Sequence, residues 1–382
     1  MFDYLIVGAG FSGAVLAERI ATQLNKRVLL IDKRNHIGGN CYDSYNKDGL
    51  LVHSYGPRVF HTNDKPIWEY LQNFTEWKTY QHKVVASVEG MLVPIPFNLN
   101  SLAKVFPAEF ANNLTKKLID TYGYGQRIPI LELLNSSDGD IKFLADFVYN
   151  KIYLNYSKKQ WGHSPDELDE YVTGRIPIVI SRDERHYPDD YQGIPRDGYN
   201  KLFKRMLDHP NIKVLLNTDY REVITLNHYS KQIKFLGQLF EGKLIYTAKL
   251  DELFDYQFGE LPYRTIDFKV HTVNQAHVQE VATINYPNDY AFTRVTETKY
   301  ITGQIHPQTA LIEEYHRQCT RKDIPYYPIP KHENLVIHEQ YKELANNFPN
   351  LITLGHLADY CYYDMHVAVS MALTKFEQLK NI

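Results

Sequence analysis

The sequence has little cysteine, no long apolar run and no excess of one charge. Three cysteines among 382 residues are an odd and low number, which argues against a disulfide framework and fits reduced thiols in the cytoplasm. No stretch reaches the ~18 apolar residues of a membrane-spanning helix, so we expect no insertion into a membrane. The apolar run near the N-terminus is short and has no basic residues before it, so we expect no secretion signal.

The charges of the chain are nearly balanced, with a net charge of −3. This balance provides no general attraction to nucleic acid or to an anionic membrane surface, and neither partner is expected. An anionic ligand would have to be held by individual arginines. The hydrophobic content of 44% is ordinary for a globular protein, and the length suggests two or three domains. We predict no metal site.

What the sequence does contain is a dinucleotide-binding pattern in its first forty residues. An apolar run at residues 4–7 leads into a turn that holds Gly8, Gly10, Ser12 and Gly13, and a helical stretch follows. A second apolar run, residues 28–31, ends on Asp32. In this pattern the first glycine permits a tight turn, the second lets a pyrophosphate approach the backbone, and the third lets the helix pack closely on the strand.

The helix that follows the turn would present free N–H groups to a phosphate, and Asp32 lies at the spacing from which a carboxylate holds a ribose hydroxyl. A glycine turn without a ligand is the alternative interpretation. It would not require the strand, the helix and the acid at these spacings, so we predict a nucleotide cofactor.

The next segment favours FAD over NAD. Lys33 and Arg34 follow the acid and can pair with phosphate, while Gly39, beside a second glycine and Asn40, permits another close approach of the backbone. This segment resembles the second nucleotide-contacting stretch of FAD-dependent enzymes of the amine-oxidase type.

Residues 53–63 allow two interpretations. The stretch HSYGPRVFHTN contains a Gly-Pro turn among varied polar residues. It is either a solvated loop or a loop that lines the flavin, with His61 near the reactive edge of the ring. Spacing alone does not choose between the two.

Three segments together carry a family resemblance. GAGFSG at residues 8–13, KRNHIGGN at 33–40 and YGPRVFHTND at 55–64 are similar to UDP-galactopyranose mutases. The resemblance implies an isomerase that interconverts the pyranose and furanose forms of a nucleotide-linked galactose on reduced FAD, through a covalent adduct between flavin N5 and the sugar. It also implies a homodimer, a nucleotide-diphosphate sugar as the bound partner, and a product used in polysaccharide synthesis.

We predict an α/β fold: a Rossmann-like FAD-binding domain with an inserted helical bundle and an antiparallel β-sheet domain. The FAD-binding domain is expected to comprise residues 1–72, 205–255 and 333–382. Helical periodicity places the bundle at residues 100–172, and strand patterns place the sheet domain at 73–99, 173–204 and 256–332. Pro94 and Pro96 indicate that their strand lies at a sheet edge.

The motifs and the resemblance together predict which residues contact FAD. Near the C-terminus, a strand, a turn and a helix N-terminus would stabilise negative charge on the reduced flavin. The expected cofactor contacts are Gly8, Gly10, Ser12, Gly13, Asp32, Lys33, Arg34, Gly39, Asn40, His61, Gly355, Asp364 and Met365.

The resemblance also implies the substrate site. Arg175 and Arg294 would hold the pyrophosphate and, with His61, form the catalytic set; Ile152 and Tyr156 would flank the uracil. In isolation, Arg175 would be interpreted as a surface ion pair. The complete set of implied substrate contacts is Arg58, His82, Ile152, Tyr156, Trp161, Arg175, His186, Asn285, Arg294, Tyr327 and Tyr362.

Four positions differ from the pattern usual in the family. Arg58, His82, His186 and His356 stand where a histidine, an asparagine, a tyrosine and an arginine are usual. An arginine in the sugar pocket could donate to a 2-acetamido oxygen or fill the space of a missing hydroxyl. UDP-N-acetylgalactosamine and dTDP-fucopyranose are therefore alternatives to UDP-galactopyranose. An amine-oxidase-like flavin oxidoreductase and a catalytically inactive nucleotide-binding protein are alternatives of other classes.

Overall fold

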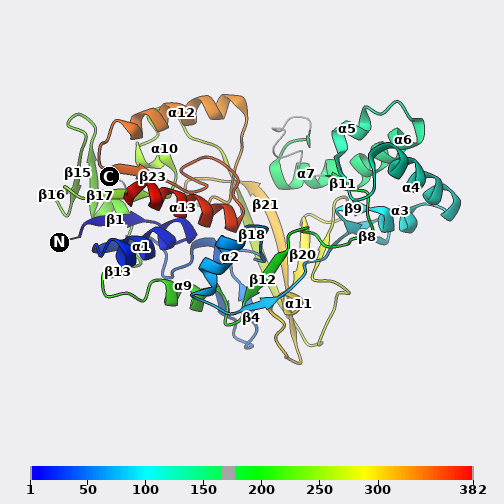
Figure 1. Cartoon of the computed structure of the whole chain (residues 1–382), viewed down its shortest axis with the longest axis horizontal. Helices are drawn as coiled ribbons and strands as arrows, with labels where there is room; N and C mark the ends of the chain where they lie inside the picture. Colours follow the sequence, from blue (N-terminus) through cyan, green and yellow to red (C-terminus); the bar gives the residue numbers. More distant parts are fainter. Residues whose placement is uncertain (1, 166–176, 381–382) are drawn as a thin grey trace.

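The glycine-rich N-terminus builds the first strand and helix of a parallel sheet. A computed structural model describes residues 2–165 and 177–380. The sheet has five strands in the order β13-β2-β1-β17-β23, and every pairing between neighbours is parallel. Its strands are β1 (Tyr4–Val7), β2 (Val28–Ile31), β13 (Ile212–Leu215), β17 (Lys243–Tyr246) and β23 (Leu351–Thr353). Segments far apart in the sequence thus meet in one sheet, on the left of Figure 1.

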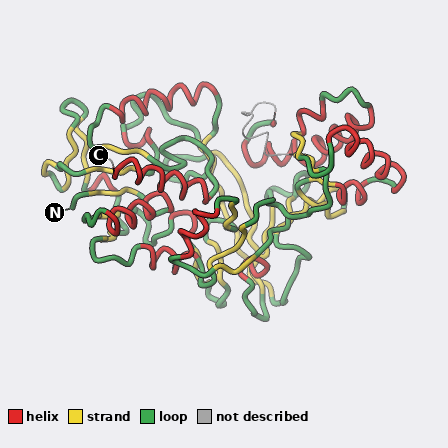
Figure 2. Tube along the Cα trace, in the orientation of Figure 1, coloured by secondary structure: helices red, strands yellow, loops and turns green. Residues whose placement is uncertain are grey.

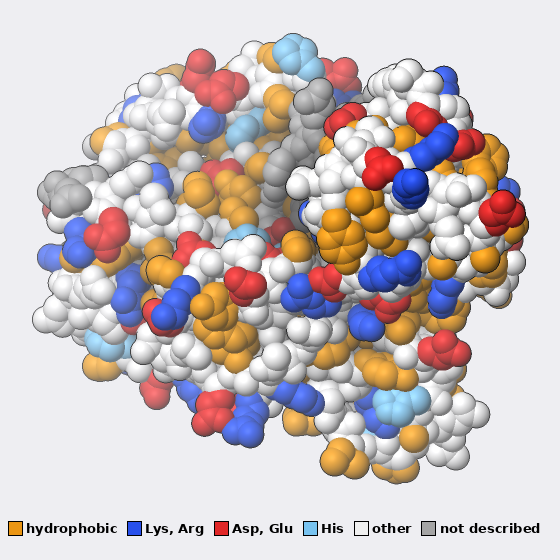
Figure 3. All heavy atoms as spheres, turned by 45° about the vertical axis from the view of Figure 1, so that its right-hand side comes forward, with side chains coloured by type: hydrophobic (Ala, Val, Ile, Leu, Met, Phe, Trp, Pro, Cys, Tyr) orange, Lys and Arg blue, Asp and Glu red, His pale blue; other side chains and the backbone are white. Residues whose placement is uncertain are grey.

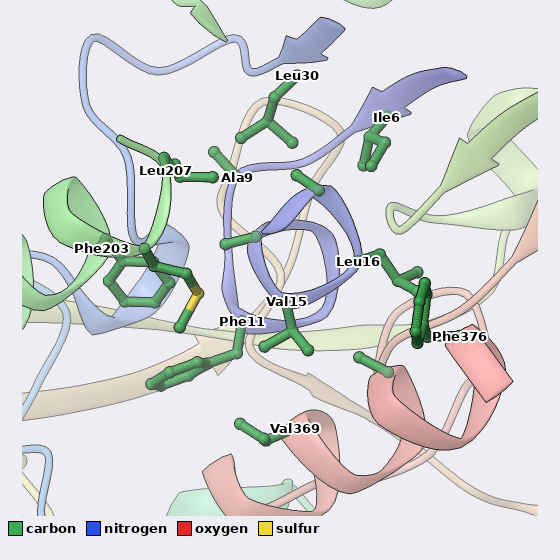
Figure 4. Close-up of a cluster of buried hydrophobic side chains, with 14 of the residues drawn as sticks. Ile6, Ala9, Phe11, Val15, Leu16, Leu30, Phe203, Leu207, Val369 and Phe376 are labelled. Atoms are coloured by element: carbon green, nitrogen blue, oxygen red, sulfur yellow. The ribbon is translucent and has the colours of Figure 1, made fainter. Parts of the chain in front are cut away.

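Helices cover this sheet and bury its apolar side chains. They are α1 (Phe11–Gln23), α2 (Lys65–Gln72), α9 (Tyr199–Met206), α10 (Leu250–Leu253), α12 (His332–Asn346) and α13 (Met365–Lys380). Figure 4 shows Phe11 and Val15 of α1 facing Phe203 of α9 and Val369 of α13. These four side chains are at most 5% exposed, so this cluster holds the N-terminal parts of α1 and α13 against each other.

The second large sheet has seven strands in the order β22-β18-β21-β20-β19-β7-β8. Its strands are β7 (Val84–Val88), β8 (Met91–Ile95), β18 (Tyr263–Val273), β19 (Thr283–Asn285), β20 (Arg294–Glu297), β21 (Thr309–Gln318) and β22 (Tyr327–Pro328). Strand β8 lies at the edge, as Pro94 predicts. The sheet is not purely antiparallel, because β7 and β19 pair in parallel.

A helical lobe follows β8 and lies on the right of Figures 1 and 2. It contains α3 (Leu99–Val105), α4 (Ala108–Tyr122), α5 (Ile130–Leu134), α6 (Gly139–Val148), a π-helical turn (Tyr149–Tyr153) and α7 (Leu154–Trp161). Asn98 and Asp138 accept hydrogen bonds from the first free N–H groups of α3 and α6. In Figure 3 this lobe stands forward, with hydrophobic side chains on the face seen there.

Shorter strands connect these parts. β5 (Phe60–Thr62), β12 (Tyr191–Pro195) and β6 (Trp77–Thr79) form one small sheet, and β10 (Arg127–Pro129), β11 (Pro177–Val179) and β9 (Phe97–Asn98) form another. Further elements are β3 (Asp43–Tyr45), β4 (Leu51–His53), β14 (Ile224–Asn227), β15 (Gln232–Phe235), β16 (Gln238–Leu239) and α11 (Thr298–Thr302). Within the described residues, none of the helices has the length and hydropathy needed to span a bilayer.

The contact between α1 and β1 leaves no room for a side chain at Gly13. A Cβ atom there would overlap the carbonyl oxygen of Gly8 and would lie 3.2 Å from the Cγ2 atom of Ile6. The obstacle is backbone, which cannot turn aside as a flexible side chain does.

We predict that Gly13→Ala destabilises the protein, because α1 must move away from β1. Overpacking of this kind typically costs about 1–3 kcal/mol, which should lower the thermal unfolding temperature by several degrees. Gly139→Ala is the matched control, because nothing lies within 4 Å of a Cβ at that position of α6. Equal unfolding temperatures for the two variants would contradict the prediction.

Several histidines lose much of their contact with water when the chain folds. Nδ1 of His53 accepts from the backbone N–H of Arg58 at 2.9 Å, and His316 lies 3.1 Å from Oγ1 of Thr293. Burial, reinforced by nearby arginines, lowers the pKa of both imidazoles to about 3. Burial likewise lowers the pKa of His186 to about 4.

These pKa values predict that stability falls as the pH drops below about 6.5, the ordinary value for an unfolded histidine. Between that pH and the lowered folded values, the unfolded chain binds protons that the folded chain does not, so stability is complete above the window and is lost downward through it. Each such histidine should contribute about 1.4 kcal/mol per pH unit.

Thermal unfolding measured from pH 7.5 to 4.5 tests this dependence. The unfolding temperature should decrease steadily below pH 6.5, and less steeply in His316→Gln, which keeps a polar group toward Thr293 without a titrating ring. A flat profile across this range would show that the buried histidines are not the cause.

Candidate functional site

One cavity of about 320 Å³ runs from the glycine turn to the seven-stranded sheet. Its walls come from the first turn of α1, the segment after β2, the loop before β5, strand β20, the segment at β22 and the start of α13. Of the residues predicted from sequence, it is lined by Gly8, Gly10, Ser12, Asp32, Lys33, Arg34, Gly39, Asn40, Arg58, His61, His82, Arg294, Tyr327, Gly355, Tyr362, Asp364 and Met365. The cavity thus brings the two ends of the predicted site together.

The end beside α1 is shaped by backbone. No side chain caps the N-terminus of α1, where Gly10 is the N-cap residue, so its first N–H groups face the cavity. The two oxygens of Asp32 accept from the N–H groups of Ala9 and Arg34, each at 2.9 Å. A Cβ at Gly39 would lie 2.9 Å from the Cα of Gly10, so two backbone segments approach closely here. This cradle fits the pyrophosphate and ribose of a dinucleotide.

Arg34 supplies a second observation that fits a phosphate. Its Nη2 donates to Oδ1 of Asn40 at 2.8 Å, and its guanidinium lies 4.6 Å from the centre of the Tyr55 ring. Its Nη1 is buried and has no hydrogen-bond partner within the part of the chain that the structure describes. A buried donor of this kind is expensive to leave unpaired, and a phosphate oxygen would satisfy it.

The loop before α13 is held by Asp359. Its Oδ2 accepts from the N–H of Gly355 and from the hydroxyl of Tyr363, both at 3.0 Å. Gly355 has a φ of +104°, which a residue with a side chain rarely adopts. Asp364, Met365 and the first turn of α13 therefore lie against the cavity with the positive end of the helix dipole.

The end at the seven-stranded sheet is built around the ion pair of Arg294 and Glu314. These residues face each other on β20 and β21, with Nε of the arginine 2.9 Å from a carboxylate oxygen. The Glu314 side chain is fully buried, whereas Arg294 keeps 27% of its side chain exposed, toward the cavity that it lines. Burial alone would lower the pKa of Arg294, but the charge of Glu314 outweighs it and raises that pKa. The cavity therefore has a fixed cation at this end.

Aromatic rings surround this cation. The Tyr327 ring stacks on that of Tyr362 with centroids 5.4 Å apart, and Trp161 of α7 packs against both. Burial raises the pKa of Tyr327 to about 12, so its hydroxyl remains a proton donor at neutral pH. Trp161 is 8% exposed and does not line the cavity directly.

Three polar side chains lie close together at the cavity wall, where His61 and Asp364 line it. One ring nitrogen of His61, a carboxylate oxygen of Asp364 and one ring nitrogen of His366 lie within 4.8 Å of one another. His61 stacks on Tyr187 at 3.7 Å between ring centroids, and its Nδ1 lies 2.9 Å from Oδ2 of Asp189. The prediction of no metal site stays a prediction.

Three further residues that the resemblance assigns to the substrate lie beside residues of the cavity wall and not in the wall itself. Oδ1 of Asn285 is buried and without a partner within the described residues, and its backbone pairs with Arg294. Tyr156 lies near the charges of Arg294 and Glu314. The ring of His186 packs edge-on at 5.7 Å against His82, which lines the cavity.

The structure does not bring Ile152 to the cavity. Its side chain is 3% exposed and packs in the hydrophobic core of the helical lobe, where an apolar side chain is more stable than at a wet site. Gly13 also lies away from the cavity wall, in the contact with Gly8. Arg175 lies outside the described residues.

Sequence reasoning missed several residues that shape the site. Tyr187 and Asp189 contact His61, Glu314 pairs with Arg294, and Asp359 holds the loop before α13. A Tyr-x-Asp stretch and a glutamate within a strand are too common to stand out. The one available signal for Glu314 was a charged residue within a stretch that otherwise has the pattern of a buried strand, because a buried charge needs a partner of opposite charge.

Comparison with known proteins agrees with this geometry. The family model described as UDP-galactopyranose mutase matches residues 151–362, and one described as an NAD(P)-binding Rossmann-like domain matches residues 6–74. The chain is 34% identical to a dTDP-fucopyranose mutase of Escherichia coli, over 98% of this chain and 97% of the relative. It is also 34% identical to a probable UDP-galactopyranose mutase of Klebsiella pneumoniae, over 97% of this chain and 93% of the relative.

A solved structure of reduced UDP-galactopyranose mutase superimposes with a TM-score of 0.77 at 15% identity, covering all of this chain and 94% of the other. The α/β fold with a Rossmann-like domain is thereby confirmed. Because the family model spans more than half of the chain and the curated relatives are 34% identical over nearly their whole length, the chain belongs to the UDP-galactopyranose mutase family.

Proposed function

We propose that the protein is a flavin-dependent isomerase that interconverts the pyranose and furanose forms of a nucleotide-diphosphate sugar, with FAD as its cofactor in the reduced state. UDP-galactopyranose is the substrate that we favour. The observation that carries the proposal is the single cavity, which joins a dinucleotide cradle at Gly8 and Gly10 to a fixed cation at Arg294.

The cradle fits FAD through several independent features. The uncapped start of α1 and the buried Nη1 of Arg34 can each receive a phosphate oxygen, and Asp32 can accept from a ribose hydroxyl. The dipole of α13 favours negative charge at the other end of the cofactor. When bound and reduced, FAD supplies the nucleophile that displaces the nucleotide from the anomeric carbon.

The protein's own residues hold the nucleotide that leaves. A diphosphate carries about two negative charges, and Arg294 offers a guanidinium fork whose charge is fixed by Glu314. Tyr327 and Tyr362 add ring surfaces beside it, and the hydroxyl of Tyr327 remains a donor. Because charge accumulates on the leaving diphosphate as the anomeric bond breaks, this cation should lower the barrier more than it tightens binding.

Arg58 lines the part of the cavity where we place the sugar. Nε and Nη2 of Arg58 donate to the carbonyl oxygens of Asn40 and Tyr55, each at 3.0 Å, which holds the guanidinium against the cavity wall. The donors that remain suit a polar substituent such as an acetamido oxygen. UDP-N-acetylgalactosamine and dTDP-fucopyranose therefore remain alternatives, and the two relatives reported above, whose names specify different sugars, are equally identical to this chain.

An amine oxidase shares the cofactor end but fits the other end poorly. Amine substrates are cationic at neutral pH, and the wall of the cavity away from the cradle carries Arg58 and Arg294. Repulsion between like charges would oppose the binding of such a substrate. These two arginines thus favour an anionic sugar nucleotide over an amine.

Incubation with candidate sugars tests the function directly. Purified FAD-loaded protein, reduced with dithionite, would be incubated separately with UDP-galactose, UDP-N-acetylgalactosamine and dTDP-fucose, and ring size would be assigned by NMR after chromatography. A furanose product from one sugar, absent with oxidised protein, is the expected result and identifies the substrate. No furanose from any of the three, with FAD bound, would contradict the proposal.

Loss of the fixed cation should slow turnover without releasing FAD. We predict that Arg294→Ala lowers kcat roughly 100-fold, the usual effect of removing one group that stabilises charge in a transition state. Arg294→Lys retains a charge opposite Glu314 and should lose less, because only the guanidinium fork is missing.

The control is Arg317→Ala on β21, which removes the same charge from ion pairs with Asp267 and Asp323 at the surface. Flavin absorbance reports cofactor content for every variant. If Arg294→Ala turned over as fast as Arg317→Ala, the assignment of the diphosphate to Arg294 would be wrong.

A homodimer in the cytoplasm completes the proposal; the family resemblance supports the dimer, and the low number of cysteines supports the compartment. Light scattering during size-exclusion chromatography would give the mass in solution. A monomer at micromolar concentration would contradict this part alone, leaving the reaction untouched.

A further inference from the structure

His61 is held from two sides by one short loop. Tyr187 lies flat against its ring, with an angle of 9° between the two planes, and Asp189 lies 2.9 Å from its Nδ1. The side chains of His61 and Asp189 are 10% and 15% exposed, so water competes weakly for this hydrogen bond. The histidine therefore has a single well-defined orientation.

The loop is itself fastened to the strand that pairs with His61. Gln192 of β12 is directly opposite His61 of β5 in the sheet register. Its Nε2 donates to the carbonyl oxygens of Tyr187 and Asp189, at 2.9 and 2.8 Å. Asn63, two residues after His61, accepts from the backbone N–H of Asp190 at 2.9 Å. The position of Asp189 is thus determined by the same strands that position His61.

While it is ionised, the carboxylate of Asp189 has no proton to donate and acts only as an acceptor. The hydrogen bond from His61 lowers the pKa of Asp189 and so favours this ionised form. Nδ1 of His61 must then carry the hydrogen. In a neutral ring this leaves Nε2 with a lone pair, on the side of the ring away from Asp189. His61 lines the cavity, and with Nδ1 engaged by Asp189 its Nε2 is the ring nitrogen left for another partner, either a ligand in the cavity or the nearby side chains of Asp364 and His366.

We propose that Asp189 is a positioning residue for the reaction: it holds Nδ1 of His61 protonated, so that Nε2 exchanges hydrogen bonds or a proton with the contents of the cavity. The inference rests on the proposed function for its effect on turnover. Its structural part, the choice of tautomer, does not depend on which sugar the enzyme uses. A carboxylate that fixes a histidine tautomer in this way is a recurring device where the second nitrogen has a task.

The tautomer can be read directly by NMR. Protein labelled with ¹⁵N-histidine would be measured at pH 8, with His61→Gln used to assign the signal. We expect His61 to show the Nδ1–H tautomer in the wild-type protein, with or without FAD. Detection of the Nε2–H tautomer in the wild type would overturn the proposal, whatever the variants do.

Two substitutions at Asp189 separate the hydrogen bond from the shape of the loop. Asp189→Ala removes the acceptor and should convert His61 to a mixture of tautomers, while kcat falls about tenfold or more and KM changes little. Asp189→Asn keeps an acceptor oxygen, so it should retain the Nδ1–H signal and more of the activity than Asp189→Ala.

The matched control is Asp190→Asn, which removes the same charge from the adjacent, exposed residue that does not touch His61. It should leave both the tautomer and kcat unchanged. An Nδ1–H signal that persists in Asp189→Ala, or a kcat for that variant equal to that of Asp190→Asn, would overturn the positioning role. If the wild type made no furanose from any sugar, the proposed function would fail while the tautomer measurement still decided this inference.

Discussion

The rest of the structure depends on the contact between Gly13 and the carbonyl oxygen of Gly8. That contact allows α1 to lie directly on β1, and its direction aims the helix N-terminus at the cavity. Helix α13 packs on the same helix through Val369 and Phe376, so the end of the chain is positioned by its beginning. A side chain at Gly13 would therefore displace both walls of the cofactor end together.

Burial determines which of the basic side chains around the cavity are charged. Burial lowers the pKa of His186 and of His356 to about 4 each, so both are neutral at physiological pH. Arg294 keeps its charge because a buried glutamate lies beside it. The arginines of the cavity, fixed by hydrogen bonds and ion pairs, therefore contribute a positive field that should change little between pH 6 and 8. A cavity that relied on protonated histidines would lose its attraction for anions over this range.

The cofactor end could be predicted from the sequence because the residues that form it lie close together in the chain. Gly8, Gly10 and Asp32 lie within one strand-helix-strand unit, and their spacing alone defines the turn. The other end required tertiary structure. His61 and Asp189 are 128 residues apart and meet only because β5 pairs with β12, a register that no short pattern specifies. Ile152 is assigned to the uracil by the family resemblance and lies in the hydrophobic core of the lobe, because apolar residues at helical spacing fit a core as well as a base-binding wall.

The sequence predicts the class of reaction but leaves several sugars open, and the positions of the residues in the fold explain why. The dinucleotide cradle is made of backbone, and Arg294 and Glu314 are locked between neighbouring strands, so few sequences can build them. Arg58 and His82 lie in loops and at strand ends, where a substitution changes the shape and hydrogen bonding of the wall without moving the sheets. Under the proposed function, exchange of a histidine for an arginine at position 58 would change the hydrogen-bond donors beside the sugar. It would leave unchanged the charge of Arg294, which we propose receives the diphosphate, so the sugar could vary while the chemistry is kept.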